Sequence, residues 1–129
     1  MPSEFIYGTQ TYHNEDVERT LVLGITQTGT SSGVIKALNQ AKALHFKTCA
    51  VSAKELSPIV TLADHSLLLH CGEEDSNAKT KGYSATLLCL LQLAYGLGYH
   101  KKTVSKELYD TFVAESLSEI YSLKSLKQK

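Results

Sequence analysis

The spacing of apolar residues changes along the first half of the chain. Leu21–Ile25 is a short continuous apolar run, as expected of a strand that is buried on both faces of a sheet. A loop rich in Thr, Ser and Gly follows, and apolar residues then recur at helical spacing from Val34 to Leu44. A strand, a polar turn and an amphipathic helix together make the first half of a βαβ unit.

The pattern continues with a second and a third strand. Residues 47–53 form a brief β-prone run, and residues 65–71 form a further buried one. Between them, Ser57 and Pro58 predict a short helix over residues 57–64, with the serine as N-cap and the proline at the first helical position.

The second half predicts two long helices. Residues 84–95 are apolar almost all round, so this helix should lie in a core or an interface, and Gly96 and Gly98 should end it. Residues 105–129 predict an amphipathic C-terminal helix.

Alternating strands and helices define the predicted architecture. Residues 3–8 could add one more strand at the front of the chain. We therefore expect an α/β fold, a three-layer α/β/α sandwich with a parallel sheet of about four to five strands. Residues 1–129 should make a single domain.

Composition and charge exclude several classes of protein. The 129 residues are 43% apolar and 20% charged, which is typical of a globular domain. Thirteen basic residues balance thirteen acidic ones, so nucleic acid and anionic membranes are not expected partners. Any bound anion must be captured by a local site.

The terminus and the cysteines favour the cytoplasm. The first residues lack the basic-then-apolar pattern of a signal peptide, and the apolar stretch 85–98 is too short to span a membrane. Three cysteines, an odd number without a C-x-x-C pair, are expected to be reduced thiols. The apolar helix over 84–95 predicts a dimer, since it should not face water.

The loop Thr26–Gly33 is the first candidate site. It joins the carboxyl end of a strand to the start of a helix, where unpaired N–H groups and the helix dipole favour a phosphate. The alternative is that its Ser and Thr residues are ordinary N-caps. The loop is neither a Walker A sequence nor a G-x-G-x-x-G turn, which disfavours nucleotides.

A second candidate follows the third strand. Lys79 and Lys81 lie near the start of a helix, where their charge opposes the helix dipole unless an anion compensates. The alternative is that both are solvated and paired with the acidic residues 73–75. Because both loops follow strands of a parallel sheet, they should lie on the same edge.

Other groups carry less weight. The five histidines have no spacing suited to a metal on one helix face, so no metal or cofactor is predicted. No nucleophile–base arrangement can be read from the order of residues. Cys71, beside the predicted site, could be reactive, although a buried structural thiol is the favoured interpretation.

The order of these segments resembles a sugar isomerase (SIS) domain, from Ser3 to about Ala94. That family's phosphate loop typically reads Ser-Gln-Ser-Gly-Glu-Thr, where this chain has Thr-Gln-Thr-Gly-Thr-Ser over residues 26–31. Ser-Glu-Phe at residues 3–5, SPIVTLAD at 57–64 and the Lys-Thr-Lys-Gly-Tyr segment at 79–83 match further family patterns. The last is closer to fructosamine- and fructoselysine-6-phosphate deglycases than to glucosamine-6-phosphate synthase.

The resemblance implies a phosphosugar site. The hydroxyl, amide and backbone donors of its first loop would bind the phosphate, and Thr30 replaces the family's Glu. In the second loop, Asn77 and Lys79 would contact the sugar or its amine substituent. The full set of expected binding residues is Thr26, Gln27, Thr28, Gly29, Ser31, Asn77, Lys79 and Lys81.

Two departures from the family bear on catalysis. Complete SIS domains begin with a βα unit that this sequence lacks, so an N-terminally incomplete SIS domain is expected. The catalytic Glu, His and Lys of the synthase lie in a second SIS domain, so catalytic residues are expected outside this chain. The expected partners are a hexose-6-phosphate or amino-sugar phosphate, and a second copy or a second SIS domain.

Three functions remain open from the sequence. The first is phosphosugar binding within an isomerase or deglycase. The second is a non-catalytic sensor or interaction module, in which sugar phosphate is an effector or the site is vestigial. The third is a flavodoxin-like nucleotide binder.

Overall fold

A computed structural model describes residues 14–71 and 80–126. The chain divides into two compact units, Met1–Ala85 and Thr86–Lys129. The predicted strand over 3–8 lies outside the described residues. No helix in the described ranges is long and apolar enough to cross a membrane.

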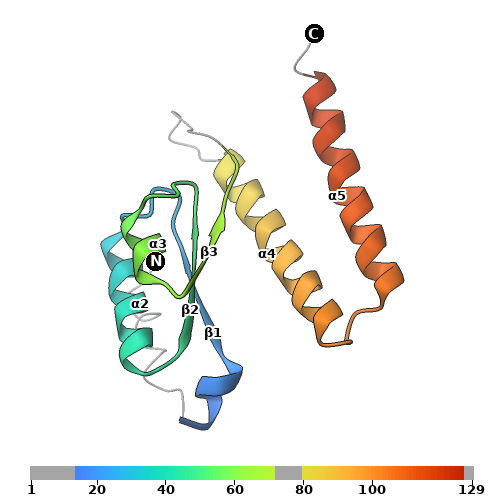
Figure 1. Ribbon diagram of the computed structural model, residues 1–129. Coiled ribbons are helices and arrows are strands. Elements are labelled where there is room, and N and C mark those ends of the chain that lie inside the picture. The colour runs from blue at the N-terminus through green and yellow to red at the C-terminus, as the bar shows by residue number, and fades with distance from the viewer. Residues whose placement is uncertain (1–13, 72–79, 127–129) are drawn as a thin grey trace. The chain divides into compact units, whose positions relative to one another are not determined.

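The first unit is built on a parallel sheet (Figure 1). A 3-10 helix, η2 (Asn14–Arg19), leads into β1 (Leu21–Ile25), which pairs with β2 (Lys47–Ser52), and β2 pairs with β3 (His65–Leu68). The strand order is β1-β2-β3, and both pairings are parallel. The parallel α/β class is thus confirmed, although the described residues form three strands rather than the four to five expected.

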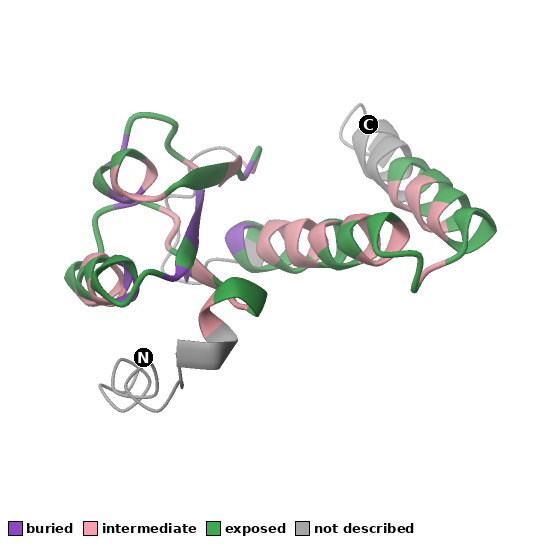
Figure 2. Ribbon diagram, turned by 60° about the horizontal axis from the view of Figure 1, so that its bottom comes forward, coloured by how far each residue is buried: buried purple, intermediate pink, exposed green. Residues whose placement is uncertain are grey.

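Two helices cover one face of this sheet. Helix α2 (Ser32–Ala43) packs on β1 and β2, and α3 (Pro58–Leu62) packs on β2 and on α2. The central strand β2 has five of its six residues buried. Its position between β1 and β3 explains why its residues are apolar or small on both faces. Figure 2 shows buried residues of this unit in the sheet, on the helices that cover it and at the start of α4 (Thr80–His100).

The core forms where these helices meet the sheet. Leu38 of α2, Ala50 of β2 and Ile59 of α3 are fully buried and in one cluster. Gly24 of β1 belongs to this arrangement, because a Cβ there would lie 2.7 Å from Leu38 Cδ1. The glycine in the apolar run 21–25 therefore makes room for the leucine of the following helix.

The third strand is shorter than predicted. Ser52, the last residue of β2, pairs with Leu68, so residues 69–71 have no strand beside them to extend the ladder on β2. A single further hydrogen bond, from Leu69 N–H to the Ser52 carbonyl at 2.8 Å, ends the pairing.

The second unit contains most of α4 (Thr80–His100) and all of α5 (Lys106–Leu126). Helix α5 lies within the predicted range 105–129, of which residues 127–129 are not described. The Ser105 hydroxyl accepts from Leu108 N–H at 3.2 Å as its N-cap. Tyr95 stacks on Phe112 and Tyr99 stacks on Tyr109, with ring centroids 4.1 and 5.0 Å apart, and these pairs join the two helices.

The prediction that Gly96 and Gly98 end the first long helix is wrong, because α4 continues to His100. Gly98 instead accommodates the returning chain: its carbonyl accepts from the N–H groups of Thr103 and Val104, at 2.9 and 3.1 Å. A Cβ at residue 98 would lie 2.5 Å from Val104 Cγ2. The glycine permits this close approach rather than breaking the helix.

Candidate functional site

The loop Thr26–Ser31 joins β1 to α2 and is fixed to the carboxyl end of β2 through its backbone. Thr26 N–H donates to the Val51 carbonyl, and Ala53 N–H donates to the Gln27 carbonyl, both at 3.0 Å. The Ser52 hydroxyl also donates to the Gln27 carbonyl at 3.3 Å. The loop is therefore held at the edge where, in parallel sheets, ligands bind.

Gly29 makes the turn of this loop. Its φ is +71°, a left-handed conformation that favours glycine, and its N–H donates to the Thr26 carbonyl at 3.3 Å. A Cβ at this position would overlap Ser57 and lie 3.1 Å from Ser52 Oγ. Both the backbone conformation and the space thus require glycine here.

The outer side of the loop presents hydrogen-bond donors. Ser31 is the N-cap of α2, but its side chain makes no capping hydrogen bond, and the first turn of α2 holds no acidic residue. The N–H groups of that turn have no carbonyl one turn earlier to bond within the helix. The exposed hydroxyls of Thr28 and Thr30 lie 2.9 Å apart beside them. Together with the positive end of the helix dipole, these donors suit an anion.

The side chain of Gln27 connects this loop with the second candidate segment. Its Nε2 donates to Cys71 Sγ at 3.8 Å, just beyond β3, and its amide group packs against Gly82 in the first turn of α4. The carboxyl ends of β1 and β3 and the start of α4 therefore meet around Gln27, as the parallel topology predicts. Lys81, next to Gly82, is exposed.

The structure places six of the eight predicted site residues. Those of the first loop lie together, and Gln27 brings that loop to Gly82, next to Lys81. Asn77 and Lys79 lie outside the described residues. Within the ranges that are described, no group of three or more His, Cys, Asp or Glu residues could hold a metal ion.

Two buried serines support the loop and were missed as site residues by sequence reasoning. Ser52 and Ser57 are 0% and 4% exposed, and the Ser57 hydroxyl donates to Ser52 Oγ at 3.5 Å. Ser57 is the N-cap of α3 as predicted, but without a side-chain capping bond. Their position in the sequence was the signal that could have found them. Ser52 ends the second strand and Ser57 follows it, at the same edge of the sheet as the loop.

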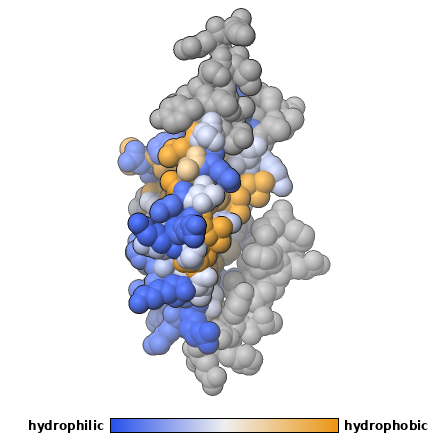
Figure 3. All heavy atoms as spheres, turned by 90° about the vertical axis from the view of Figure 1, so that its right-hand side faces the viewer, coloured by the Kyte–Doolittle hydropathy of each residue, from blue (hydrophilic) through white to orange (hydrophobic). Residues whose placement is uncertain are grey.

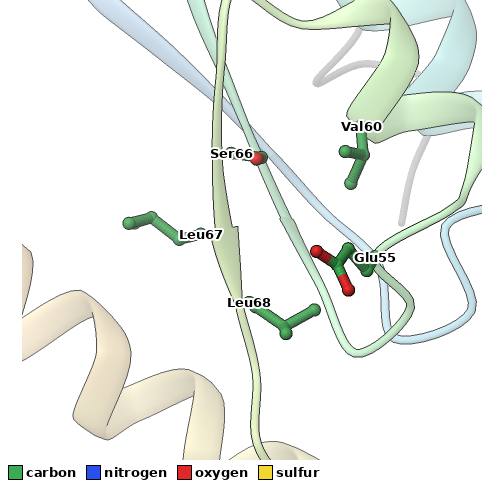
Figure 4. A pocket seen from close by; sticks show the side chains of 5 residues that line it. All are labelled: Glu55, Val60, Ser66, Leu67 and Leu68. Carbon is green, nitrogen blue, oxygen red and sulfur yellow. The ribbon is translucent and has the colours of Figure 1, made fainter.

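A small pocket of about 110 Å³ lies elsewhere, beside β3 (Figure 4). Val60, Glu55 and Leu68 converge on one side of the strand, whereas Leu67 points to the other. The charged group in its lining is the Glu55 carboxylate, which would repel a phosphate. None of the predicted site residues lines it, so the loop Thr26–Ser31 remains the candidate site.

The fold and the loop define a class: a parallel α/β domain with a turn that suits an anion at the carboxyl edge of its sheet. The family model described as SIS domain matches residues 11–96, and the chain belongs to this family. This confirms the resemblance seen in the motifs, although Ser-Glu-Phe at 3–5 lies outside the matched range.

Curated relatives and a solved structure agree with this assignment. The chain is 33% identical over 83% of its length to a glutamine–fructose-6-phosphate aminotransferase (isomerizing) of Helicobacter pylori, and 34% identical over 87% to that of Treponema pallidum. It spans 17% of the length of each. A candidate phosphosugar isomerase of Clostridium difficile 630 matches 99% of this chain and 36% of its own, with a TM-score of 0.80 and 30% identity.

Proposed function

We propose that the chain binds a sugar phosphate, a hexose-6-phosphate or an amino-sugar phosphate, with the phosphate on the loop Thr26–Ser31. The observation that carries the proposal is the uncapped start of α2: the Ser31 side chain does not cap the helix, and no acid lies in its first turn. Such a helix start favours an anion, and the neighbouring hydroxyls add donors without adding charge.

The relatives support the class of ligand. The enzymes of Helicobacter pylori and Treponema pallidum are named for fructose-6-phosphate, and the Clostridium difficile protein for phosphosugars. In our proposal the residues Thr26, Gln27, Thr28, Gly29 and Ser31 bind the phosphate. The second segment, with Asn77, Lys79 and Lys81, contacts the sugar.

Calorimetric titration with fructose-6-phosphate, glucosamine-6-phosphate and inorganic phosphate tests the proposal. Thr28→Val keeps the shape of the side chain and removes a hydroxyl, so binding should weaken by about 1–3 kcal/mol if that hydroxyl bonds a charged phosphate. Thr111→Val is the matched control. It makes the same change within α5, where the Thr111 hydroxyl donates to the Glu107 carbonyl, and it lies outside the proposed site. Equal affinity of both variants and the unaltered chain would contradict the assignment.

We propose a binding role without turnover for the chain alone. The isomerisation that names the relatives needs a general acid and base, and the resemblance puts those of the synthase in a second SIS domain. An assay of fructose-6-phosphate conversion should detect none by this chain, while calorimetry detects binding. A chain that turns over substrate would refute this part of the proposal.

A second copy, or a second SIS domain, is the partner that we propose. Residues 83–99 of α4 contain no charged side chain, and no residue from 86 to 118 is buried. Hydrophobic side chains reach the surface between hydrophilic ones on the face drawn in Figure 3. Light scattering should give a mass of twice the 14.1 kDa of one chain. A mass of one chain at every protein concentration would contradict the proposed homodimer.

The cytoplasm is the location that we propose. None of the three cysteines, Cys49, Cys71 and Cys89, all of which lie in the described part of the chain, forms a disulfide. Free thiols persist where glutathione and thioredoxin keep cysteines reduced. Cell fractionation with the native chain tests the location.

A further inference from the structure

The side-chain amide of Gln27 is confined from two sides. Nε2 donates to Cys71 Sγ at 3.8 Å, within the reach of a hydrogen bond to sulfur. On the other side lies Gly82, which is buried in the first turn of α4. A Cβ there would lie 2.7 Å from Gln27 Cδ and 3.1 Å from Oε1, and would overlap Nε2.

The backbone of Gln27 is confined as well. Its carbonyl accepts from Ala53 N–H at 3.0 Å and from the Ser52 hydroxyl at 3.3 Å. A glutamine normally keeps several rotamers, and ordering them on binding weakens affinity. Here the amide is held before any ligand arrives. An NH₂ group has two N–H donors, so one remains for a ligand oxygen after Cys71 is bonded.

We infer that Cys71 and Gly82 are positioning residues, which orient the Gln27 amide for the sugar phosphate. The inference rests on the proposed function, because Gln27 is there a phosphate ligand. The thiol accepts one N–H and fixes the direction of the amide. The glycine leaves the space that the amide occupies, so a methyl group at residue 82 displaces the amide.

Helix α4 offers an internal control for the glycine. Gly96 lies on the same helix, and a Cβ added there meets nothing within 4 Å. Gly82→Ala and Gly96→Ala thus make the same chemical change, and the first should disturb Gln27. Cys89, about two turns beyond Gly82 on α4, is the corresponding control for Cys71.

The first measurement needs no ligand. The side-chain NH₂ resonances of Gln27 are followed by NMR in the full chain, and they should shift in Cys71→Ala and Gly82→Ala. They should stay in place in the controls Cys89→Ala and Gly96→Ala. Unchanged resonances in both test variants would overturn the inference, whether or not the chain binds sugar phosphate.

The second measurement is a binding cycle with fructose-6-phosphate. Gly82→Ala and Gln27→Ala should each weaken binding about tenfold, as expected for the loss of one hydrogen bond to a charged group. The double variant should bind no more weakly than Gln27→Ala alone, because the methyl group then has no amide to displace. Losses that multiply would overturn the inference. An unaltered chain that does not bind would instead refute the proposed function, leaving the NMR result to decide the positioning role.

Discussion

Single residues in strained backbone conformations show what packing imposes on this chain. His45 follows α2 with φ at +64°, and its N–H donates to the Lys42 carbonyl at 2.9 Å. Phe46 N–H donates to the Ala41 carbonyl at 2.9 Å, so the helix ends in a turn of the type that glycine favours. Phe46 itself is 3% exposed, so a buried side chain follows the turn directly.

His45→Gly should therefore stabilise the fold. Glycine avoids the steric cost of about 1–2 kcal/mol that other residues bear at positive φ, but it loses about 0.5–1 kcal/mol more conformational entropy on folding, so we expect the free energy of unfolding to rise by a net amount of about 0.5–1 kcal/mol. Urea unfolding measures the change. Leu44→Gly is the control, because Leu44 has φ at −90° and its glycine variant should be less stable. A loss of stability in both variants would contradict the prediction.

Asp64 joins the start of β2 to the end of α3. The hydroxyl and the N–H of Thr48 both donate to its carboxylate, each at 2.8 Å, and Lys42 Nζ lies 3.5 Å from it. The hydrogen bond from the Thr48 hydroxyl, followed by the one from its N–H, holds the pKa of Asp64 below its ordinary value of 3.8. Partial desolvation acts to raise this pKa, and the charge of Lys42 acts to lower it further.

The lowered pKa of Asp64 sets the sign of an acid effect. The ionised carboxylate stabilises the fold fully above pH 3.8, and this contribution is lost as pH falls through the lower pKa of the folded state. In urea unfolding at decreasing pH, Asp64→Asn should be less stable than the unaltered chain at neutral pH and should lose less stability below pH 3.8. Asp110→Asn, on exposed α5, serves as control. Parallel acid profiles for all three chains would argue against this role of Asp64.

At the scale of elements, the two glycines of α4 have different roles. Gly96 has open space where a Cβ would be, whereas Gly98 is approached by Val104. Gly96→Ala should raise the free energy of unfolding by about 0.5–1 kcal/mol through helix propensity. Gly98→Ala should lower it by about 1–3 kcal/mol through overpacking against the returning chain. Urea unfolding of the pair checks both signs; equal effects would show that packing on Gly98 is unimportant.

Periodicity predicted the elements of the sheet because burial on both faces leaves a continuous apolar run. It did not predict their ends. The third strand ends at Leu68 because β2 ends at Ser52, a fact of pairing that residues 65–71 do not contain. The helix predicted over 84–95 continues past its glycines to His100, and Val104 packs on one of them, Gly98, a contact made only after the chain reverses.

The candidate site, like the elements, could be predicted only in part. The loop 26–31 follows an apolar run and precedes a helical pattern, so its place at the sheet edge could be predicted from local sequence. Its supports could not, because Ser52 is 25 residues and Cys71 is 44 residues from Gln27 along the chain. Contacts of this range depend on the pairing of strands, which leaves no local signal.

At the scale of the whole molecule, the proposed phosphate site can form only when the sheet is assembled. The loop is held by Val51 and Ala53 of β2 and its following turn, by Ile59 of α3 and, through Gln27, by Cys71 beyond β3. An unfolded chain keeps the residues of the loop but none of these constraints. A sugar phosphate should therefore bind the folded state and not the unfolded one.

Binding to the folded state alone must stabilise it. Fructose-6-phosphate at a concentration of about 100 times its Kd should raise the free energy of unfolding by about 2.7 kcal/mol. Thermal unfolding measured over a concentration series checks this, and Thr28→Val should need correspondingly more ligand for the same rise. Thr111→Val should follow the unaltered chain. A midpoint that does not move with ligand, in a chain shown by calorimetry to bind it, would mean that the phosphate is held by a segment that needs no sheet.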